Sequence, residues 1–451
     1  MFRWGPFCFF VFLFQIIFFN ALHANEASTA SSSEVPLEFD LKQSIERALA
    51  VNPEALRARE ALKEGDSIFY SAISNAGPQV NGAISYRRQK DSATGQSRFS
   101  GQTYNLYDVQ LEARQTLLER GFISEILIGR SEQRLRKLNY EIAIRDLSYR
   151  IIQAFYRLLA LQSRVELLKE TKRVYEKNLK ITQRRQQIGQ SQKLDFLKLK
   201  AEVALIDPQI EEAENNLVTE RAFFANQLIL ENFESLKLNA ALNVPSFEFL
   251  ESKIQSLDSL VPEVELVEEE RAVIEKQAIV NLGRHWPKLE AVGSFGRSGF
   301  DKGDVFDNDA NRWTVGLQLS IPIFSSFLYL HEKSRWESLE RQSLHQEQNI
   351  KNQNVYQRIK SKKDLQSAYS VIQASQKAKD LVEEALKEAR RYYELARINY
   401  LELLDSEQSL LRSEISLLQA KVNYIQSLTQ FFQSHGFASS TLIDVLSAQG
   451  G

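Results

Sequence analysis

Two acidic side chains in the last part of the sequence have a spacing that would let them act together. Glu402 and Asp405 are three residues apart, so on a helix both carboxylates project from one face. Several copies of this face around one axis would attract cations and repel anions, because a narrow opening focuses the field. A solvated helix face is the alternative interpretation, and the spacing alone leaves both open.

Residues that commonly bind metals or attack substrates are few. Cys8 is the only cysteine, and it lies in an apolar N-terminal segment. Neither a glycine-rich phosphate loop nor a nucleophile elbow is present. The formal charge of -2 does not favour nucleic acid as a partner. We therefore expect no enzymatic activity, cofactor or metal. The histidines are widely separated, without metal-ligand spacing, at His23, His285, His331, His345 and His435.

The first 24 residues have the pattern of a secretory signal. Arg3 precedes an apolar run over residues 7–19, and small residues end the segment at Ala24. The run is shorter than the roughly 20 apolar residues that cross a bilayer, which disfavours the alternative of an N-terminal membrane anchor. We expect residues 1–24 to be removed by cleavage after Ala24, and residues 25–36 to form an N-terminal linker.

An internal repeat of about 200 residues organises the remaining chain. Residues 184–189 and 194–197 are matched, with identical spacing, by residues 391–396 and 401–404. Each copy has the pattern of a helix, two strands, a long helix, a turn and a helix, and Asp40 is the expected N-cap of the first helix. The expected segments are repeat 1 over 37–230, a linker over 231–255, repeat 2 over 256–433 and a C-terminal tail over 434–451.

The long helices have the apolar spacing of coiled coils. In the second copy Leu404, Leu411 and Leu418 fall seven residues apart, which makes a narrow seam that a neighbouring helix must cover. A helix over residues 124–187 would be about 95 Å long. Heptads alone also suit a cytoskeletal or scaffolding rod. The corresponding series in the first copy is Leu147, Ile151, Ala154, Leu158, Leu161, Val165 and Leu168.

Four segments of about ten residues, the length of a barrel strand, alternate apolar and polar side chains. They form one pair within residues 79–118 and another within residues 288–323. The edge of a soluble sandwich, with one face on a core, is the alternative interpretation. The apolar positions are Val80, Ile84, Tyr86, Tyr107, Val109, Leu111, Ala113, Leu289, Ala291, Phe295, Trp313, Val315, Leu317, Leu319 and Ile321.

Four strands are too few to close a barrel, which needs about eight or more. Three chains would supply about twelve, a size found among outer-membrane barrels. Trimerisation therefore follows if the strands meet lipid with their apolar faces and water with their polar faces. The loops between the strands are polar, at residues 89–103 and 298–311. The second is acidic and glycine-rich but lacks the spacing of a calcium loop, so we interpret it as a solvated outer loop.

With these features, the chain resembles the TolC family of outer-membrane efflux and secretion channels over about residues 37–432. The resemblance rests on the duplicated plan, the coiled-coil helices, the junctions at residues 116–121 and 320–324, and the two helix–helix turns. It implies a mainly α fold with β strands, as a trimer with a twelve-stranded outer-membrane barrel. The barrel would continue into a periplasmic coiled-coil tunnel that opens at its helix ends.

The resemblance also implies the cargo classes and the partners. Family members export drugs and other small molecules, or type I secreted polypeptides. The implied partners are two further copies of the chain, outer-membrane lipid, a periplasmic adaptor and an inner-membrane pump of the RND or ABC type. A periplasmic coiled-coil adaptor or a coiled-coil scaffold is the competing interpretation. An adaptor, however, would have one hairpin between small β domains, rather than two copies that each hold a strand pair.

Residues near the turns receive roles from the same resemblance. It places Glu402 and Asp405 in an acidic ring at the periplasmic entrance. It assigns Asp195 to a latch that keeps the entrance closed, with Tyr393 and Arg397 as candidate partners.

The turns themselves are the expected contacts for the adaptor. Gly189 marks the first turn and Ala396 the second. The family favours glycine at the position of Ala396, so the second turn departs from the pattern.

Overall fold

The computed structural model describes most of the chain after residue 37. The predicted signal segment and the N-terminal linker lie outside the described residues. No helix in the described part is both long enough and apolar enough to cross a membrane. The described residues are 38–90, 101–189, 192–234, 236–238, 240, 242–247, 250, 261–301, 303, 305, 311–395 and 397–447.

The first repeat begins with two helices, α2 (Leu41–Val51) and α3 (Pro53–Ala76). The Asp40 carboxylate accepts the Gln43 N–H at 2.7 Å, and the Gln43 side chain accepts the Asp40 N–H at 3.3 Å. This capping box confirms the predicted N-cap. The predicted single helix, however, is broken at Asn52. Asn52 caps α3, and Pro53 takes the first helical position, where a missing N–H has no cost.

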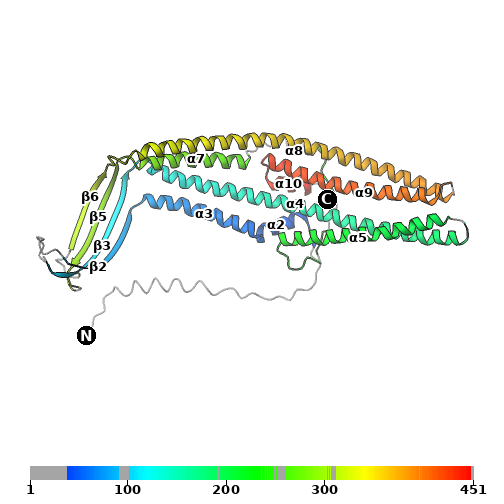
Figure 1. Cartoon of the computed structure of the whole chain (residues 1–451), viewed down its shortest axis with the longest axis horizontal. Coiled ribbons are helices and arrows are strands. Elements are labelled where there is room, and N and C mark those ends of the chain that lie inside the picture. Colours follow the sequence, from blue (N-terminus) through cyan, green and yellow to red (C-terminus); the bar gives the residue numbers. More distant parts are fainter. Residues whose placement is uncertain are drawn as a thin grey trace, which may run out of the picture. The chain divides into compact units, whose positions relative to one another are not determined.

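Four long helices form two antiparallel hairpins (Figure 1). The first hairpin joins α4 (Phe122–Gln187) to α5 (Lys193–Gln227), and the second joins α8 (Leu328–Glu394) to α9 (Tyr400–Ser434). With 66 residues, α4 is about 99 Å long. It also packs against α9, which joins the hairpins side by side. The predicted heptad positions Leu147, Ile151 and Leu158 are fully buried, as a covered seam requires.

Shorter elements lie along these helices. Helix α7 (Pro262–Gly283) packs against α4 and α8. A two-residue parallel pair joins β1 (Glu38–Phe39) to β4 (Lys237–Leu238). Helix α10 (Ser439–Ser447) lies in the segment assigned to the tail. Sequence patterns indicated neither the β1–β4 pair nor α10.

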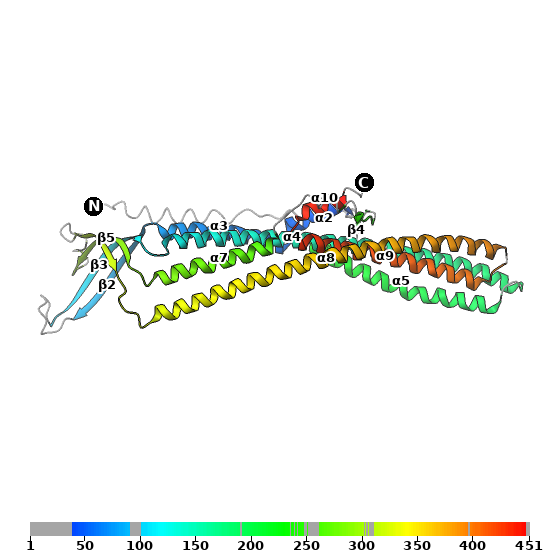
Figure 2. The same ribbon diagram turned by 90° about the horizontal axis from the view of Figure 1, so that it is seen from above.

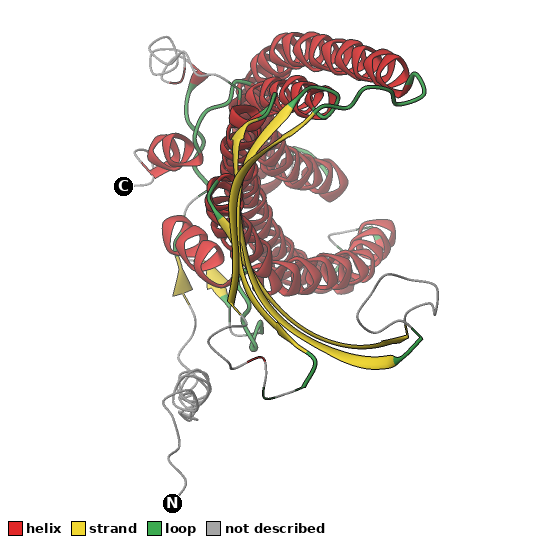
Figure 3. Ribbon diagram, turned by 90° about the vertical axis from the view of Figure 1, so that its left-hand side faces the viewer, coloured by secondary structure: helices red, strands yellow, loops and turns green. Residues whose placement is uncertain are grey.

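The sheet contains β2 (Gln79–Lys90), β3 (Thr103–Leu118), β5 (Lys288–Gly299) and β6 (Asn311–Ser320), in that antiparallel order. Figure 3 shows it as a curved layer, and Figure 1 places it at one end of the long helices. The four strands confirm the period-two prediction. The order leaves β2 and β6 as the two edges.

The strand register gathers the apolar side chains on one face of the sheet. Ile84 pairs with Val109, Leu111 with Phe295, and Ala291 with Leu317. The apolar face is open rather than covered, since Ile84 is 84% exposed. A sandwich edge would have this face on a core, so the structure does not support that alternative.

The junction between β3 and α4 in the first repeat lies close against the junction between α7 and β5 in the second repeat. Gly121 precedes α4 with a φ of 100°, and a Cβ there would lie 2.8 Å from the Val280 Cα. A Cβ on Gly283 would lie 1.9 Å from the carbonyl oxygen of Arg120. Glycine is therefore required at both positions, because any side chain would push the junctions of the two repeats apart.

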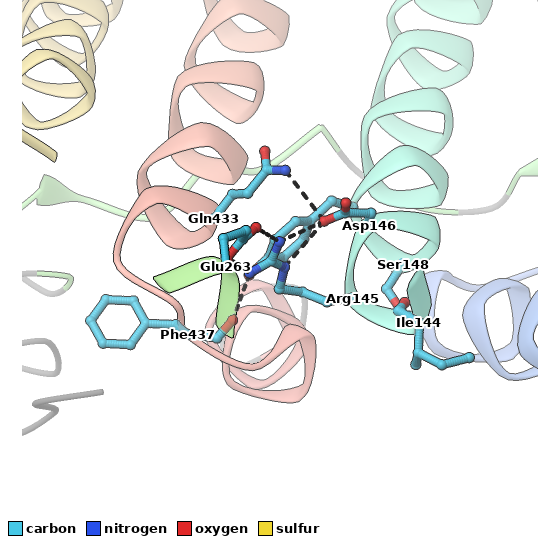
Figure 4. A network of polar contacts seen from close by, with 8 residues as sticks. Ile144, Arg145, Asp146, Ser148, Glu263, Gln433 and Phe437 are labelled. Carbon is cyan, nitrogen blue, oxygen red and sulfur yellow. Dashed lines mark hydrogen bonds and ion pairs between the residues drawn. The ribbon is translucent and has the colours of Figure 1, made fainter. Parts of the chain in front are cut away.

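A buried arginine belongs to a network of polar contacts that joins three helices (Figure 4). Arg145 of α4 donates to both carboxylate oxygens of Glu263 in the first turn of α7, and to Asp146 at 2.9 and 3.1 Å. Gln433 of α9 donates to the same Asp146 oxygen at 3.3 Å. Burial opposes the charge of Arg145, but the hydrogen bonds and negative charges of Glu263 and Asp146 together outweigh it and raise the pKa of Arg145 above its ordinary value. The guanidinium therefore stays charged.

The corresponding glutamate of the first repeat also pairs with α4. Glu54 follows Pro53 at the start of α3, as Glu263 follows Pro262 at the start of α7. Glu54 forms an ion pair with Arg150 of α4. Both repeats thus anchor the start of a helix on the same long helix.

Replacing Arg145 should destabilise the bundle. In Arg145→Met the carboxylates of Glu263 and Asp146 lose their buried cation, and we expect a loss of about 1–3 kcal/mol. Thermal unfolding followed by far-UV circular dichroism should show a lower midpoint. Arg173→Met is the matched control, because the Arg173–Glu170 pair is exposed and contributes little. Equal midpoints for the two variants would contradict the role of Arg145.

Candidate functional site

The two helix–helix turns lie at the end of the bundle remote from the sheet (Figure 2). Gly189 has a φ of 75° and donates its N–H to the Gln186 carbonyl at 3.0 Å, so it ends α4 in a left-handed turn. Among the described residues, no atom lies within 4 Å of the place a Cβ on Gly189 would occupy. Ala396, the predicted marker of the second turn, lies outside the described residues.

The predicted acidic pair lies at the start of α9. Asn399 caps this helix by accepting the Glu402 N–H at 3.0 Å. Glu402 and Asp405 are both exposed, Asp405 with 78% of its side chain. A guanidinium nitrogen of Arg412 lies 3.9 Å from the Asp405 carboxylate. The carboxylates therefore stand on an accessible helix face, as their spacing predicts. Glu402 lies in the first turn of α9, where the helix dipole favours a negative charge.

The three predicted latch residues occupy different parts of the turns. Asp195 is buried in the first turn of α5. Tyr393 is half-buried in the last turn of α8, where its ring meets that of Tyr400 at 5.7 Å. The Arg185 guanidinium of α4 lies 5.1 Å from the Tyr393 ring centre, so a cation–π contact joins the two hairpins.

Arg397 lies in the second turn itself. Its side chain is exposed, and its N–H donates to the Tyr392 carbonyl at 2.8 Å. The guanidinium is therefore accessible to a partner outside its own turn.

A buried carboxylate between the hairpins was missed by the sequence analysis. Glu407 of α9 is 8% exposed, and Asn178 of α4 donates to its two oxygens at 3.3 and 3.4 Å. Burial raises the pKa of Glu407 above its ordinary value, although Arg390 and Asn178 act in the opposite direction. A signal was present, because Glu407 continues the steps of three and four that link Leu404 and Leu411.

The surroundings of Glu407 are unusually poor in hydrogen bonds. The hydroxyls of Tyr175 and Thr182 are buried and have no hydrogen-bond partner in the described part of the chain, and the Tyr400 hydroxyl is buried beside Asn178. Burial raises the pKa of both tyrosines above the ordinary range. Both tyrosines therefore stay neutral, and Glu407 is the acidic side chain buried between α4 and α9.

A metal centre finds no support at this end of the bundle. Across the described ranges, no group of three or more His, Cys, Asp or Glu side chains could hold a metal ion.

The model of the "outer membrane efflux protein" family matches residues 44–224 and 257–436. The chain belongs to this family. The match includes both copies of the helical hairpin, and an adaptor or a scaffold is therefore not favoured. Members are outer-membrane channels rather than enzymes, which confirms the predicted family, class and location.

Two curated relatives share part of this efflux-family chain. It is 22% identical to the cation efflux system protein CusC of Escherichia coli K12 over 265 residues, 58% of the chain and 57% of CusC. It is 23% identical to the proteases secretion protein PrtF of Dickeya chrysanthemi over 231 residues, 49% of each protein. The chain thus spans about half the length of these relatives.

Solved structures show the same fold over almost the whole chain. The outer membrane protein VceC of Vibrio cholerae superposes with a TM-score of 0.78, at 16% identity, over 88% of the chain and 96% of VceC. The CmeC outer membrane channel of Campylobacter jejuni gives a TM-score of 0.75, at 15% identity, over 94% and 96%. The predicted TolC-like fold, mainly helical with four strands per chain, is confirmed.

Proposed function

We propose that this protein is a homotrimeric outer-membrane channel that exports cargo from the periplasm. The observation that carries the proposal is the four-stranded sheet, which has an open apolar face and two free edges at one end of the long hairpins. Such a sheet needs lipid on its face and further strands at its edges. Membership of the outer membrane efflux protein family supports a membrane environment for the sheet.

Three copies would satisfy both edges of each sheet. If β6 of one copy pairs with β2 of the next, the strands form a closed ring of about twelve, a size found among outer-membrane barrels. Trp313 and Val315 of β6, which are 72% and 77% exposed, would then face lipid. The polar face, with Asp108 and Arg312 3.9 Å apart, would line the water-filled interior.

The helices offer matching surfaces for the other copies. Val355, Tyr356 and Ile359 of α8 are about 60% exposed, and Leu205 of α5 is 58% exposed. These apolar side chains would be buried where neighbouring hairpins meet, at about 25 cal/mol for each Å² removed from water. The same trimer would collect the Glu402 and Asp405 carboxylates around one axis.

The acidic pair favours cationic cargo, because a negative ring at a narrow opening concentrates cations. Export of small molecules through a periplasmic adaptor and an inner-membrane pump of the RND or ABC type is the function that fits this arrangement. The relative CusC is named for cation efflux. PrtF is named for protease secretion, and polypeptide cargo of a type I system is the second candidate.

Fractionation of cells that express the full chain tests the proposal directly. We expect the protein in the outer membrane, extracted by detergent as a trimer that forms conducting pores in lipid bilayers. Deleting the protein should also raise susceptibility to cationic drugs or metal ions. A protein that fractionates with the inner membrane and forms no pores would contradict the proposed function.

Neutralising the acidic pair should weaken the cation preference of the pore. Glu402→Gln with Asp405→Asn removes two charges from each copy at the proposed entrance, so the reversal potential in a salt gradient should move toward zero. The control is Glu166→Gln with Glu170→Gln, two exposed carboxylates on α4 far from the turns. An unchanged reversal potential in the Glu402→Gln, Asp405→Asn variant would contradict the proposed acidic ring.

Weakening the proposed latch should open the entrance. We assign the latch to contacts of Asp195 with Tyr393 and Arg397 between neighbouring copies, each contributing about 0.5–3 kcal/mol. Asp195→Ala with Tyr393→Phe should therefore increase the single-channel conductance. Tyr392→Phe is the matched control, because this exposed tyrosine lies beside Tyr393 on the same helix. Wild-type conductance in the double variant would count against the latch.

A further inference from the structure

Glu407 lies in the seam where α9 of the second hairpin packs against α4 of the first. We propose that Glu407 is a protonation-controlled lock, which holds the two hairpins of one chain together when it is neutral and loosens them when it ionises. The lock acts within a single chain. It therefore stands apart from the proposed export function and from the latch between copies.

The hydrogen bonds of Glu407 are too few to stabilise a buried charge. Asn178 is its only hydrogen-bond donor in the described part of the chain. The nearest cation is Arg390 of α8, whose guanidinium nitrogen lies 3.9 Å from the Glu407 Oε1. The Arg390 side chain is 54% exposed, so water screens this pair. A carboxylate removed from water needs more hydrogen-bond donors than this to offset the free energy lost when its charge is desolvated.

The neutral groups around Glu407 do not compensate for the missing donors. The buried hydroxyls of Tyr175 and Tyr400 stay protonated and form no hydrogen bond to Glu407. The Thr182 hydroxyl is also buried without a partner in the described residues. The packing thus leaves the Tyr175 and Thr182 hydroxyls of the seam unsatisfied, and hydration of these groups on separation would favour the open state.

Other charged and titratable groups face the seam from each neighbouring helix. Glu202 of α5 and Arg412 of α9 act on Tyr175 with opposite signs. Tyr393 of α8 lies near Tyr400. Arg390 therefore remains the cation closest to Glu407. Removing it should make the packing of the two hairpins depend more strongly on whether Glu407 is protonated.

Protons can reach Glu407 although the side chain is buried. A groove of about 470 Å³ opens between α4, α8 and α9, and Glu407 forms part of its wall. Lys177, Arg185 and Glu394 stand along the same groove. The carboxyl can therefore exchange its proton with solvent while the hairpins remain packed.

The direction of the pH effect follows from the environment of Glu407 in the two states. In the packed seam, burial raises the pKa of Glu407, whereas in separated hairpins the hydrated carboxyl would have its ordinary pKa. Below the ordinary pKa the group is neutral in both states, so packing is fully stable. As the pH rises through the raised pKa, ionisation favours separation and stability of the packed seam is lost.

Hydrogen exchange of the full-length protein in detergent tests the lock. The segments to follow are residues 172–184 of α4 and 400–411 of α9, between pH values of about 4 and 8, with correction for the intrinsic exchange rate. We expect wild-type protection to fall by up to about tenfold for each pH unit between the ordinary and the raised pKa. In Glu407→Gln, protection should stay at the wild-type acid value at every pH. In Arg390→Gln, the fall in protection should begin at the same pH as in the wild type, continue to a higher pH and be larger in total.

Glu384→Gln is the matched control, since Glu384 is an exposed carboxylate on α8, and it should keep the wild-type pH dependence. The same pH dependence in Glu407→Gln as in the wild type would overturn the lock. If that variant does not assemble, wild-type protection that is independent of pH in both segments would overturn it as well. Exchange is read without transport, so a failure of the export function leaves this result unaffected.

Discussion

The open apolar face of the four-stranded sheet is the constraint on which the rest of the structure depends. Ile84 and Val315, on its two edge strands, are 84% and 77% exposed, and a patch of this kind marks a membrane or protein interface. Its edges also offer unpaired backbone groups, which must find partners before the sheet enters lipid. The long helices α4 and α8 begin shortly after strands β3 and β6 of this sheet. At that place Gly121 and Gly283 let the junctions of the two repeats approach each other, so both strand pairs join one sheet.

The long hairpins combine an apolar seam with a few buried polar groups. A heptad seam alone tolerates sliding along the helix axis, because successive turns resemble one another. The bonds of Arg145 to Glu263, and the pair of Arg150 with Glu54, connect the start of a helix in each repeat to one place on α4. These directional bonds define where α3 and α7 start along α4. Glu407 differs from Arg145 in that few hydrogen-bond donors surround it. We therefore infer that the packing of α9 on α4 is less stable near the helix–helix turns.

Local sequence patterns predicted the parts of the fold that are repeated over many residues. The alternation around Ile84 and Trp313 identified strands because every second side chain of a strand lies on the same face, and the spacing of Glu402 and Asp405 predicted that both lie on one helix face. The break at Asn52 was missed because the apolar pattern continues across it. The pairing of Phe39 with Leu238 joins residues far apart in the chain, which no local pattern records. The burial of Glu407 likewise depends on Asn178, a residue of the other hairpin.

Disulfide cross-linking between the two edge strands tests most directly whether the sheets of three copies join. Cysteines placed on β2 at Ala83 and on nearby positions, and on β6 at Gly316 and its neighbours, would sample the unknown register between copies. Chains with both cysteines should give covalent trimers that vanish on reduction, since each copy contacts two others around a closed ring. Chains with one cysteine should give trimers in no case. If every combination of positions yields only monomers, or an open ladder of products beyond the trimer, the closed trimeric sheet is contradicted.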